Sequence, residues 1–167
     1  MHTFQAVALI AATMTMGAMS GMFALYAHTV MPGLGRTDDR TFVGAFQAMD
    51  RAIFNVWFMA GGFLGALVFS ATAAALLLGG DARGVLPWVV AALALYLVVV
   101  VITMTVNVPL NNAIKAAGDP HEVADLAAVR ARFDEARWSR WNLARTVLCT
   151  AAFGLLTWAL VEFGKTV

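Results

Sequence analysis

Four long apolar runs dominate this sequence, at about residues 3–30, 54–78, 85–106 and 143–163. A transmembrane helix needs about 20 predominantly apolar residues, so each run is long enough to cross a bilayer. The composition agrees, because 61% of the residues are hydrophobic and 13% are charged, whereas a soluble domain has about 45–50% apolar and about 25% charged residues. We therefore predict an all-α membrane four-helix bundle that forms a single four-span transmembrane domain over residues 1–167.

Helix-breaking residues separate the predicted spans. Pro32-Gly33 follows the first run, Gly79-Gly80-Asp81 ends the second, and Pro87 suits the first turn of the third. No Lys or Arg precedes the first run, which is also too long for the apolar part of a signal peptide. We expect the first span to be retained.

The first and third loops each contain an amphipathic segment. Over residues 37–53, apolar side chains recur at helical spacing among charged ones: Phe42, Phe46, Met49 and Ile53. In the third loop, Asp119-Pro120-His121-Glu122 has the N-cap, first-turn proline and capping-box glutamate of a helix start. It predicts a helix that begins there and places Leu126, Val129 and Phe133 on its apolar side. We expect both amphipathic helices to lie at the membrane interface.

The basic residues gather at one end of the predicted bundle. With four spans, both termini lie on one side of the membrane, and the first and third loops lie on the other. Those two loops and the adjoining span ends hold nine of the eleven Lys and Arg residues: Arg36, Arg40, Arg51, Lys115, Arg130, Arg132, Arg137, Arg140 and Arg145. The positive-inside rule therefore predicts a multi-pass cell-membrane protein with the first and third loops cytoplasmic and both termini on the outer side.

The charge and metal-ligand patterns argue against several classes of function. The net charge is +1 and there is no basic tract or zinc-finger spacing, so we expect no nucleic-acid partner. His28 and His121 lack a second histidine at helical spacing, so we predict no metal site and no bound cofactor. Copper(I) is an alternative because methionines, which also fill packing gaps, cluster near the first run: Met14, Met16, Met19, Met22 and Met31. The predicted partners are membrane lipids and a hydrophobic small molecule.

Small residues lie at spacings that favour close helix packing. Gly17 and Gly21 in the first run, and Gly61 and Gly65 in the second, are each four residues apart. Such pairs let helix backbones approach closely, either within one bundle or between protomers, so a homo-oligomer through these faces stays open. Cys149 is alone in an apolar run and is expected to be a small core residue.

Carboxamides and a proline interrupt the end of the third apolar run, in Asn107-Val108-Pro109-Leu110-Asn111-Asn112. Pro109 cannot donate a backbone hydrogen bond, so a carbonyl one turn earlier loses its partner. In lipid that carbonyl must find another donor, and Asn107 and Asn111 are close enough in sequence to supply one. These asparagines either hold helices together around a kink or line a cavity that is open to a ligand.

The other spans place polar residues at the same end. His28 belongs to the first span, Asn55 to the second, and Asn142 and Arg145 to the fourth. We expect them to form one polar pocket with the asparagines of the third span. His28 is either a packing residue or a proton acceptor.

Arg145 lies about one turn inside the fourth span, where a cation costs roughly 2.5–3.5 kcal/mol unless it is paired or reaches the interface. It either snorkels to the nearby interface, pairs with Asp50 or Asp134, or binds an anionic oxygen of a ligand.

Four motifs surround the predicted pocket: His28-Thr29-Val30-Met31-Pro32-Gly33-Leu34, the stretch 46–55, Asn107-Val108-Pro109-Leu110-Asn111, and Trp141-Asn142-x-x-Arg145. Together they resemble the DUF1772 or anthrone oxygenase-like family, over about residues 17–150. The resemblance implies a small four-helix membrane protein, and some fungal members are associated with oxidising anthrones to anthraquinones. Where relatives often have Asn-Pro, this chain has Asn55-Val56; we expect this difference to straighten the second helix and alter the pocket.

Two hypotheses follow from the pocket and the resemblance. The first is a cofactor-independent oxygenase acting on a phenolic or polycyclic aromatic substrate, in which His28 removes a proton and Arg145 stabilises the enolate oxygen. The expected substrate-binding residues are the carboxamides and the tryptophan of these motifs: Asn55, Asn107, Asn111, Trp141 and Asn142. The second is a non-catalytic membrane protein that binds or carries a lipid, a quinone or another small amphiphile.

Overall fold

The computed structural model describes residues 2–79 and 82–166, and that part of the chain contains helices but no strand. Four helical stretches in it are long and apolar enough to cross a membrane: His2–Leu34, Val56–Leu77, Arg83–Lys115 and Leu126–Gly164. The predicted all-α fold with four long apolar helices is therefore confirmed. Gly80 and Asp81, which belong to the predicted end of the second span, lie outside the described residues.

Each of these stretches is divided into segments. The first consists of α1 (His2–Leu25), η1 (Tyr26–Val30) and α2 (Met31–Leu34), and the second of α4 (Val56–Phe58), η2 (Met59–Phe63) and α5 (Leu64–Leu77). The third consists of η3 (Arg83–Val85), α6 (Leu86–Ile102), η4 (Thr103–Asn107) and α7 (Val108–Lys115). The fourth consists of α8 (Leu126–Phe133) and α9 (Glu135–Gly164), and α3 (Asp39–Ala52) belongs to the first loop.

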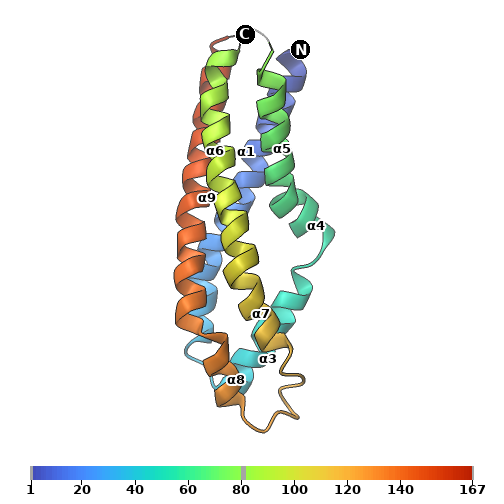
Figure 1. The fold of residues 1–167 in the computed structure, drawn as a ribbon, viewed down its shortest axis with the longest axis vertical. Helices are drawn as coiled ribbons and strands as arrows, with labels where there is room; N and C mark the ends of the chain where they lie inside the picture. The colour runs from blue at the N-terminus through green and yellow to red at the C-terminus, as the bar shows by residue number, and fades with distance from the viewer. Residues whose placement is uncertain (1, 80–81, 167) are drawn as a thin grey trace.

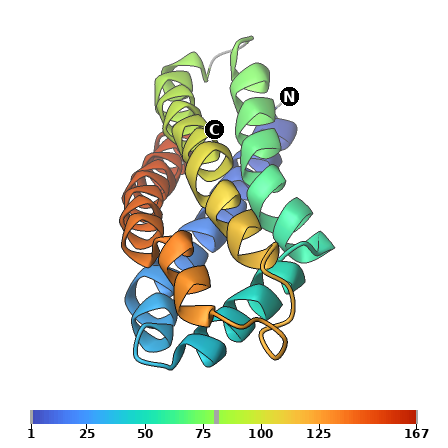
Figure 2. The same ribbon diagram turned by 60° about the horizontal axis from the view of Figure 1, so that its bottom comes forward.

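The long helices form a bundle in which each one packs on two neighbours. α1 lies between α5 and α9, and α6 packs against the same two helices (Figure 1). Both termini lie at one end of the bundle, whereas α3, α7 and α8 lie at the other (Figures 1 and 2). This arrangement matches a four-span topology, in which the first and third loops share one end.

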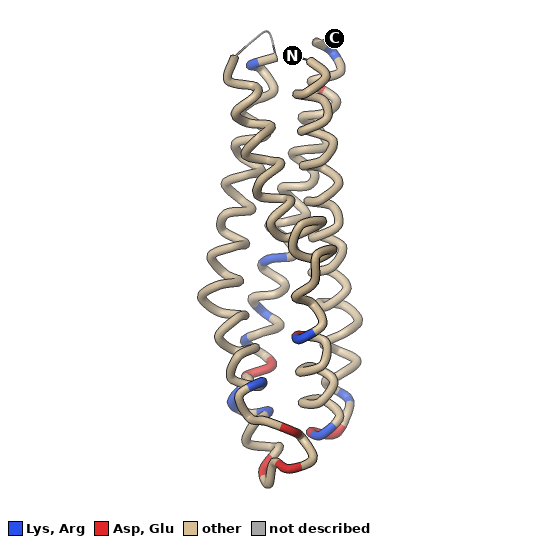
Figure 3. Tube along the Cα trace, turned by 90° about the vertical axis from the view of Figure 1, so that its right-hand side faces the viewer, with Lys and Arg blue, Asp and Glu red and all other residues tan. Residues whose placement is uncertain are grey.

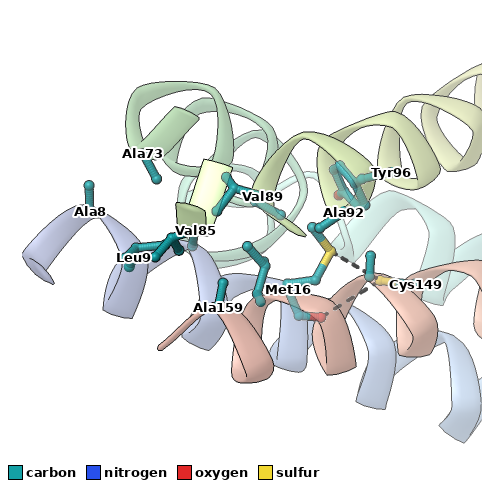
Figure 4. Packing of buried hydrophobic residues seen from close by; sticks show 14 of the residues in the cluster. Ala8, Leu9, Met16, Ala73, Val85, Val89, Ala92, Tyr96, Cys149 and Ala159 are labelled. Atoms are coloured by element: carbon teal, nitrogen blue, oxygen red, sulfur yellow. Dashed lines mark hydrogen bonds between the residues drawn. The ribbon is translucent and has the colours of Figure 1, made fainter. Parts of the chain in front are cut away.

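Small and bulky apolar side chains alternate in the core between these helices. Leu9 and Met16 of α1 belong to the same buried cluster as Ala92 of α6 and Ala159 of α9 (Figure 4). Cys149 is fully buried, and its Sγ lies 3.7 Å from the backbone oxygen of Met16 and 3.6 Å from its Sδ. Cys149 is thus a small core residue, as predicted. The alanines allow the close approach of backbones on which helix association in lipid depends.

One glycine of each spaced pair packs inside the bundle. A Cβ on Gly17 would lie 2.9 Å from the ring of Phe153 on α9. One on Gly65 would lie 3.3 Å from Thr15 on α1, and closer still to the backbone oxygen of Ala60 in its own helical stretch. The first of these contacts is too close for any side chain larger than that of glycine. The other glycine of each pair has open space at the Cβ position. Only one glycine of each pair therefore lies in a close contact within the bundle.

The amphipathic helices α3 and α8 close the loop end with a second apolar core. Their apolar faces meet residues of α2, α7 and α9 in one cluster: Met31, Phe42, Val43, Phe46, Ile114, Phe133 and Trp138. Gln47 of α3 is buried there, and its Nε2 donates to the carbonyls of Ile114 and Gly118 at 2.8 and 3.0 Å. Both predicted amphipathic helices are therefore present and are fixed to the bundle.

Arg130 connects the first loop to the fourth helical stretch. Its guanidinium donates to the backbone carbonyls of Gly35 and Thr37 and to the carboxylates of Asp39 and Glu135, at 3.0–3.1 Å. A planar guanidinium with four acceptors forms a network, which stabilises a fold more than an isolated surface ion pair does.

The predicted start of the third-loop helix is wrong. α8 begins at Leu126, and its N-cap is Asp125, whose side chain accepts from the N–H of Ala128 at 2.9 Å. Asp119 instead closes a turn, because its Oδ1 accepts from the N–H of His121 at 2.9 Å. An aspartate satisfies nearby N–H groups equally well in a turn and at a helix start, so the local motif does not distinguish the two.

Charged residues concentrate at the end of the bundle that carries α3 and α8 (Figure 3). At the opposite end, the charged side chains among the described residues are Arg83, Glu162 and Lys165. This is the asymmetry on which the predicted membrane orientation depends.

Candidate functional site

Three of the four long stretches widen into a π-turn toward the loop end. In each one, a backbone N–H reaches the carbonyl five residues earlier: Met31 to Tyr26, Leu64 to Met59, and Val108 to Thr103. π-turns are rare and occur frequently at functional sites. Here all three contribute side chains to the same cavity.

Prolines account for two of the π-turns. Pro32 and Pro109 each lie two residues after such a turn ends. A proline gives no N–H to the carbonyl four residues earlier and its ring clashes with that carbonyl, so a wider turn relieves the contact. The chain stays helical through Pro109 as far as Lys115. The helix therefore extends beyond the apolar run of about residues 85–106 that was predicted to cross the membrane.

The second helical stretch is bent for a different reason. Its π-turn contains Gly61-Gly62, and a Cβ on Gly62 would lie 2.8 Å from the sulfur of Met19 on α1. Asn55 caps the short α4 before it, because its Oδ1 accepts from the N–H of Phe58 at 3.0 Å and its Nδ2 donates to the carbonyl of Ala52 at 2.8 Å. The expectation of a straight second helix is wrong, since glycines supply the irregularity even without a proline.

A cavity of about 370 Å³ lies where the π-turns face one another. This volume falls within the range of about 300–1,000 Å³ that is typical of ligand sites. Most of its walls are aromatic or aliphatic, including Phe23, Tyr26, Phe46, Ile53, Phe58, Phe63 and Trp138. A small set of polar side chains also lines it: Asp50, Thr103, Asn107, Asn111, Asn142 and Arg145.

Arg145 is the buried cation of this cavity, with 5% of its surface exposed. Its Nη1 donates to Thr103 Oγ1 at 3.1 Å and its Nη2 to Asn142 Oδ1 at 2.9 Å, while its Nε has no partner. Within the described chain, no carboxylate oxygen lies within 4.0 Å of the guanidinium. Arg145 therefore neither snorkels to solvent nor forms an ion pair with the protein.

The two carboxylates considered as partners of Arg145 are engaged elsewhere. Asp50 pairs with Lys115, with Oδ2 and Nζ 2.6 Å apart. Asp134 caps α9, where its side chain accepts from the N–H of Arg137 at 3.1 Å. The predicted pairing of Arg145 with either residue is wrong.

Asn111 links α3 to α9 across the cavity. Its Nδ2 donates to Asp50 Oδ1 at 2.6 Å, and its Oδ1 accepts from Trp138 Nε1 at 2.7 Å. Asn107 donates from Nδ2 to the backbone oxygen of Trp138 at 3.3 Å, while its Oδ1 is buried without a partner. The asparagines therefore bind neighbouring helices and not the carbonyl freed by Pro109, contrary to that interpretation.

The unpaired Nε of Arg145 and the unpaired Oδ1 of Asn107 give the site one free donor and one free acceptor. A buried polar atom without a hydrogen bond costs about 1–3 kcal/mol, and more when the group is charged. Two such atoms on residues that line one cavity call for an explanation. A ligand that accepts from the guanidinium and donates to the carboxamide would satisfy both.

Four of the predicted site residues come together at the cavity, namely Asn107, Asn111, Asn142 and Arg145. Asn142 also fixes α9 to α1, because its Nδ2 donates to the carbonyl of Phe23 at 3.0 Å. A polar residue inside an apolar run was the signal that identified all four.

The structure does not bring His28, Asn55 or Trp141 to the wall of this cavity. His28 is exposed, with its Nδ1 2.6 Å from Thr29 Oγ1. Asn55 is an exposed helix cap beside a smaller hollow of about 230 Å³. Trp141 is exposed on α9.

Asp50 and Trp138 line the cavity but were not among the predicted site residues. Asp50 stands four residues after Phe46, so it lies on the apolar face of α3. A carboxylate on the apolar face of an amphipathic helix is the signal that would have found it. Trp138 shares a helical face with Asn142 and Arg145, so that shared face is the signal that would have found it.

The described residues contain no group of three or more His, Cys, Asp and Glu side chains placed to hold a metal ion. The methionines considered for copper belong to different parts of the bundle. Met14 is exposed, Met16 and Met19 lie in the main core, Met22 lines the cavity, and Met31 belongs to the second core.

The comparisons with known proteins agree with the resemblance seen in the motifs. No curated protein and no solved structure matches the chain. A family model described as anthrone oxygenase matches residues 53–155, which is more than half of the sequence. The matched stretch includes Asn107, Asn111, Asn142 and Arg145. The chain therefore belongs to the anthrone oxygenase family.

Proposed function

We propose that this protein is a membrane oxygenase that oxidises a phenolic or polycyclic aromatic substrate bound in the cavity. The observation that carries the proposal is the buried Arg145 guanidinium, which lies at a largely apolar cavity without a carboxylate partner in the described chain. A buried cation is costly unless negative charge compensates it. An aromatic substrate whose oxygen becomes anionic fits both the walls and the cation.

The cavity has separate features for the ring and for its oxygen atoms. Phe23, Phe58 and Phe63 offer aromatic surface to a planar ring. The free Nε–H of Arg145 would donate to a phenolate or enolate oxygen, and the free Oδ1 of Asn107 would accept from a hydroxyl group. A charge-assisted hydrogen bond is strong in a site from which water is excluded, so it stabilises charge that develops during the reaction.

Proton removal in this proposal falls to Asp50, the carboxylate that lines the cavity. It takes a proton from the methylene carbon of an anthrone-type ring and leaves an enolate, whose oxygen Arg145 stabilises. The electron-rich carbon adds dioxygen, protonation gives a hydroperoxide, and loss of water leaves a carbonyl. One CH₂ group and one O₂ become one C=O group and one H₂O, so no external reductant is required.

The test compares Asp50→Asn with His28→Ala in lipid nanodiscs, by anthrone consumption and oxygen uptake above the protein-free rate. Asp50→Asn should lower turnover about a hundredfold, the lower limit for a general base, because Asn keeps an acceptor for Asn111 but cannot take a proton. His28→Ala should retain wild-type turnover, since His28 lies outside the cavity. Absence of turnover in the wild type would overturn the proposed function, and loss in His28→Ala alone would return the role of base to His28.

Binding or transport of an amphiphile without chemistry is the second candidate function. It is favoured by the engagement of Asp50, which forms an ion pair with Lys115 and accepts a hydrogen bond from Asn111, each at 2.6 Å, and so has less capacity for a substrate proton. Mass spectrometry of the small molecule that is extracted with the native protein separates the two. An oxidised aromatic compound supports the oxygenase, whereas a phospholipid or quinone without turnover supports the carrier.

A further inference from the structure

The cavity reaches the outer surface of the bundle between the second and third helical stretches. Three of its lining side chains are exposed: Phe54 by 62%, Leu64 by 45% and Met104 by 57%. All three are apolar, and in a membrane such a surface faces lipid. At the other side of the cavity, Asn107 and Arg145 are 1% and 5% exposed. The cavity therefore runs from an apolar, exposed rim to a polar, buried floor.

The opening arises because the second stretch leaves its neighbour at the π-turn. α5 packs on α6, and the hydroxyl of Tyr96 on α6 donates to the carbonyl of Phe63, the last residue of η2, at 2.9 Å. On the loop side of this hydrogen bond, α4 leans away from α6 and α7 (Figure 1). The second stretch begins there, at its N-cap Asn55. The rim thus lies beyond this hydrogen bond, where the second stretch has moved away from the third.

The loop end of the cavity is closed by aromatic packing. Phe46 and Trp138 line the cavity, are buried, and have ring centroids 5.6 Å apart in an edge-on contact. Phe133 of α8 packs against Phe46, with their ring centroids 4.5 Å apart. A ligand that approached from the water at this end would have to displace part of the second core, which packs as densely as a protein interior.

We propose that a planar aromatic phenol reaches this cavity sideways from the bilayer, between Phe54 and Leu64 on one side and Met104 on the other, with its oxygen directed to Arg145. The choice of ligand rests on the proposed function, whereas the route is inferred from the exposed apolar side chains at the rim. A flat apolar molecule dissolves in the acyl region and crosses an apolar rim without desolvating any polar group. Its oxygen then meets hydrogen-bonding groups only at the buried floor.

The test measures how fast a phenol binds when the rim is narrowed or widened. The probe is 1,8-dihydroxyanthraquinone, and binding to protein in phosphatidylcholine nanodiscs is followed by quenching of tryptophan fluorescence after rapid mixing. Met104→Phe should slow association and dissociation about tenfold each and leave Kd within twofold, because it obstructs the route and not the floor. Met104→Ala should accelerate both rates. Leu64→Phe, on the opposite side of the rim, provides a second narrowing variant if Met104→Phe does not fold.

The matched control is Val101→Phe, which adds the same ring to an exposed position of α6 outside the cavity lining and should leave both rates unchanged. Narrowed variants that bind as fast as Val101→Phe would overturn the route and leave the oxygenase proposal standing. Wild-type protein that binds the probe but never oxidises an anthrone would overturn the oxygenase proposal and leave the route standing. Failure of the wild type to bind the probe would overturn the route as well.

Discussion

Arg145 is held in the bundle by neutral groups alone. Besides its bonds to Thr103 and Asn142, its guanidinium lies 4.6 Å from the ring centroid of Phe23 and 5.6 Å from that of Trp138. Cation–π contacts contribute about 0.5–2 kcal/mol each, which offsets only part of the cost of burying a charge. At this residue the requirements of binding and of stability oppose each other.

We predict that Arg145→Met weakens ligand binding without lowering stability. Methionine is apolar and unbranched, and it removes a cation that costs roughly 2.5–3.5 kcal/mol inside a span, so the Tm in detergent should equal or exceed that of the wild type. Affinity for an anionic phenol should fall at least about tenfold, or about 1.4 kcal/mol. Calorimetric titration and thermal melts measure the two quantities.

Arg130→Met is the control, and it should show the opposite profile. It removes four hydrogen bonds, three of which tie the first loop to the fourth stretch, so the free energy of unfolding should fall by about 2 kcal/mol or more, with affinity unchanged. An Arg145→Met protein that melts far below the wild type yet still binds the phenol would contradict the assignment.

Side chains could be assigned to the site from sequence only where they were unusual for their surroundings. Asn107 and Arg145 stand out in apolar runs, whereas Asp50 is one of several charged residues in its segment and stands out only by its position on the apolar face of the helix. His28 follows Gly17 and Gly21 at helical spacing, but the buried face of α1 runs through larger residues such as Met16 and Phe23. Small residues mark where backbones can approach, not where side chains are buried.

Among the helical elements, the π-turns are what give this bundle its cavity. Each one adds a residue to a turn, which rotates the helix beyond it by about 100° relative to a regular continuation. Long, uniformly apolar runs hide such changes of register, since every face of the helix is hydrophobic. The four spans were therefore predictable from length and composition, and Pro109 marked one of the bends, while the bend at Gly61-Gly62 and the start of α8 were not predicted.

We predict that Pro109→Ala damages the site without reducing helix content. Alanine restores the missing N–H and favours a regular α-helical turn, which would rotate α7 relative to α6 and separate Asn111 from Asp50 and Trp138. Phenol affinity should fall at least about tenfold, with an unchanged circular dichroism spectrum.

Pro87→Ala is the matched control, since Pro87 occupies the first turn of α6 at the far end of the bundle and its replacement should leave affinity intact. If Pro109→Ala bound the phenol as tightly as Pro87→Ala does, the link between the π-turn and the site would be refuted.

The molecule as a whole is asymmetric along its axis, with most charges at the end that carries α3 and α8 (Figure 3). We predict that this end faces the cytoplasm, because basic residues are retained there during insertion. In a Cys149→Ala background, Thr166→Cys should react in intact cells with a membrane-impermeant maleimide, and Thr37→Cys should react only after permeabilisation. The reverse labelling pattern would invert the orientation.

The hydrogen bond from Tyr96 to Phe63 divides the second stretch into a packed part and a splayed part. α5 contributes several buried residues to the main core, whereas α4 contributes the partly buried Phe58, so the bundle depends less on α4 than on α5 for its stability. Changes in the splayed part can therefore reshape the rim at little cost to folding. One portion of this chain is constrained by the need to assemble, and the other is free to adapt to different ligands.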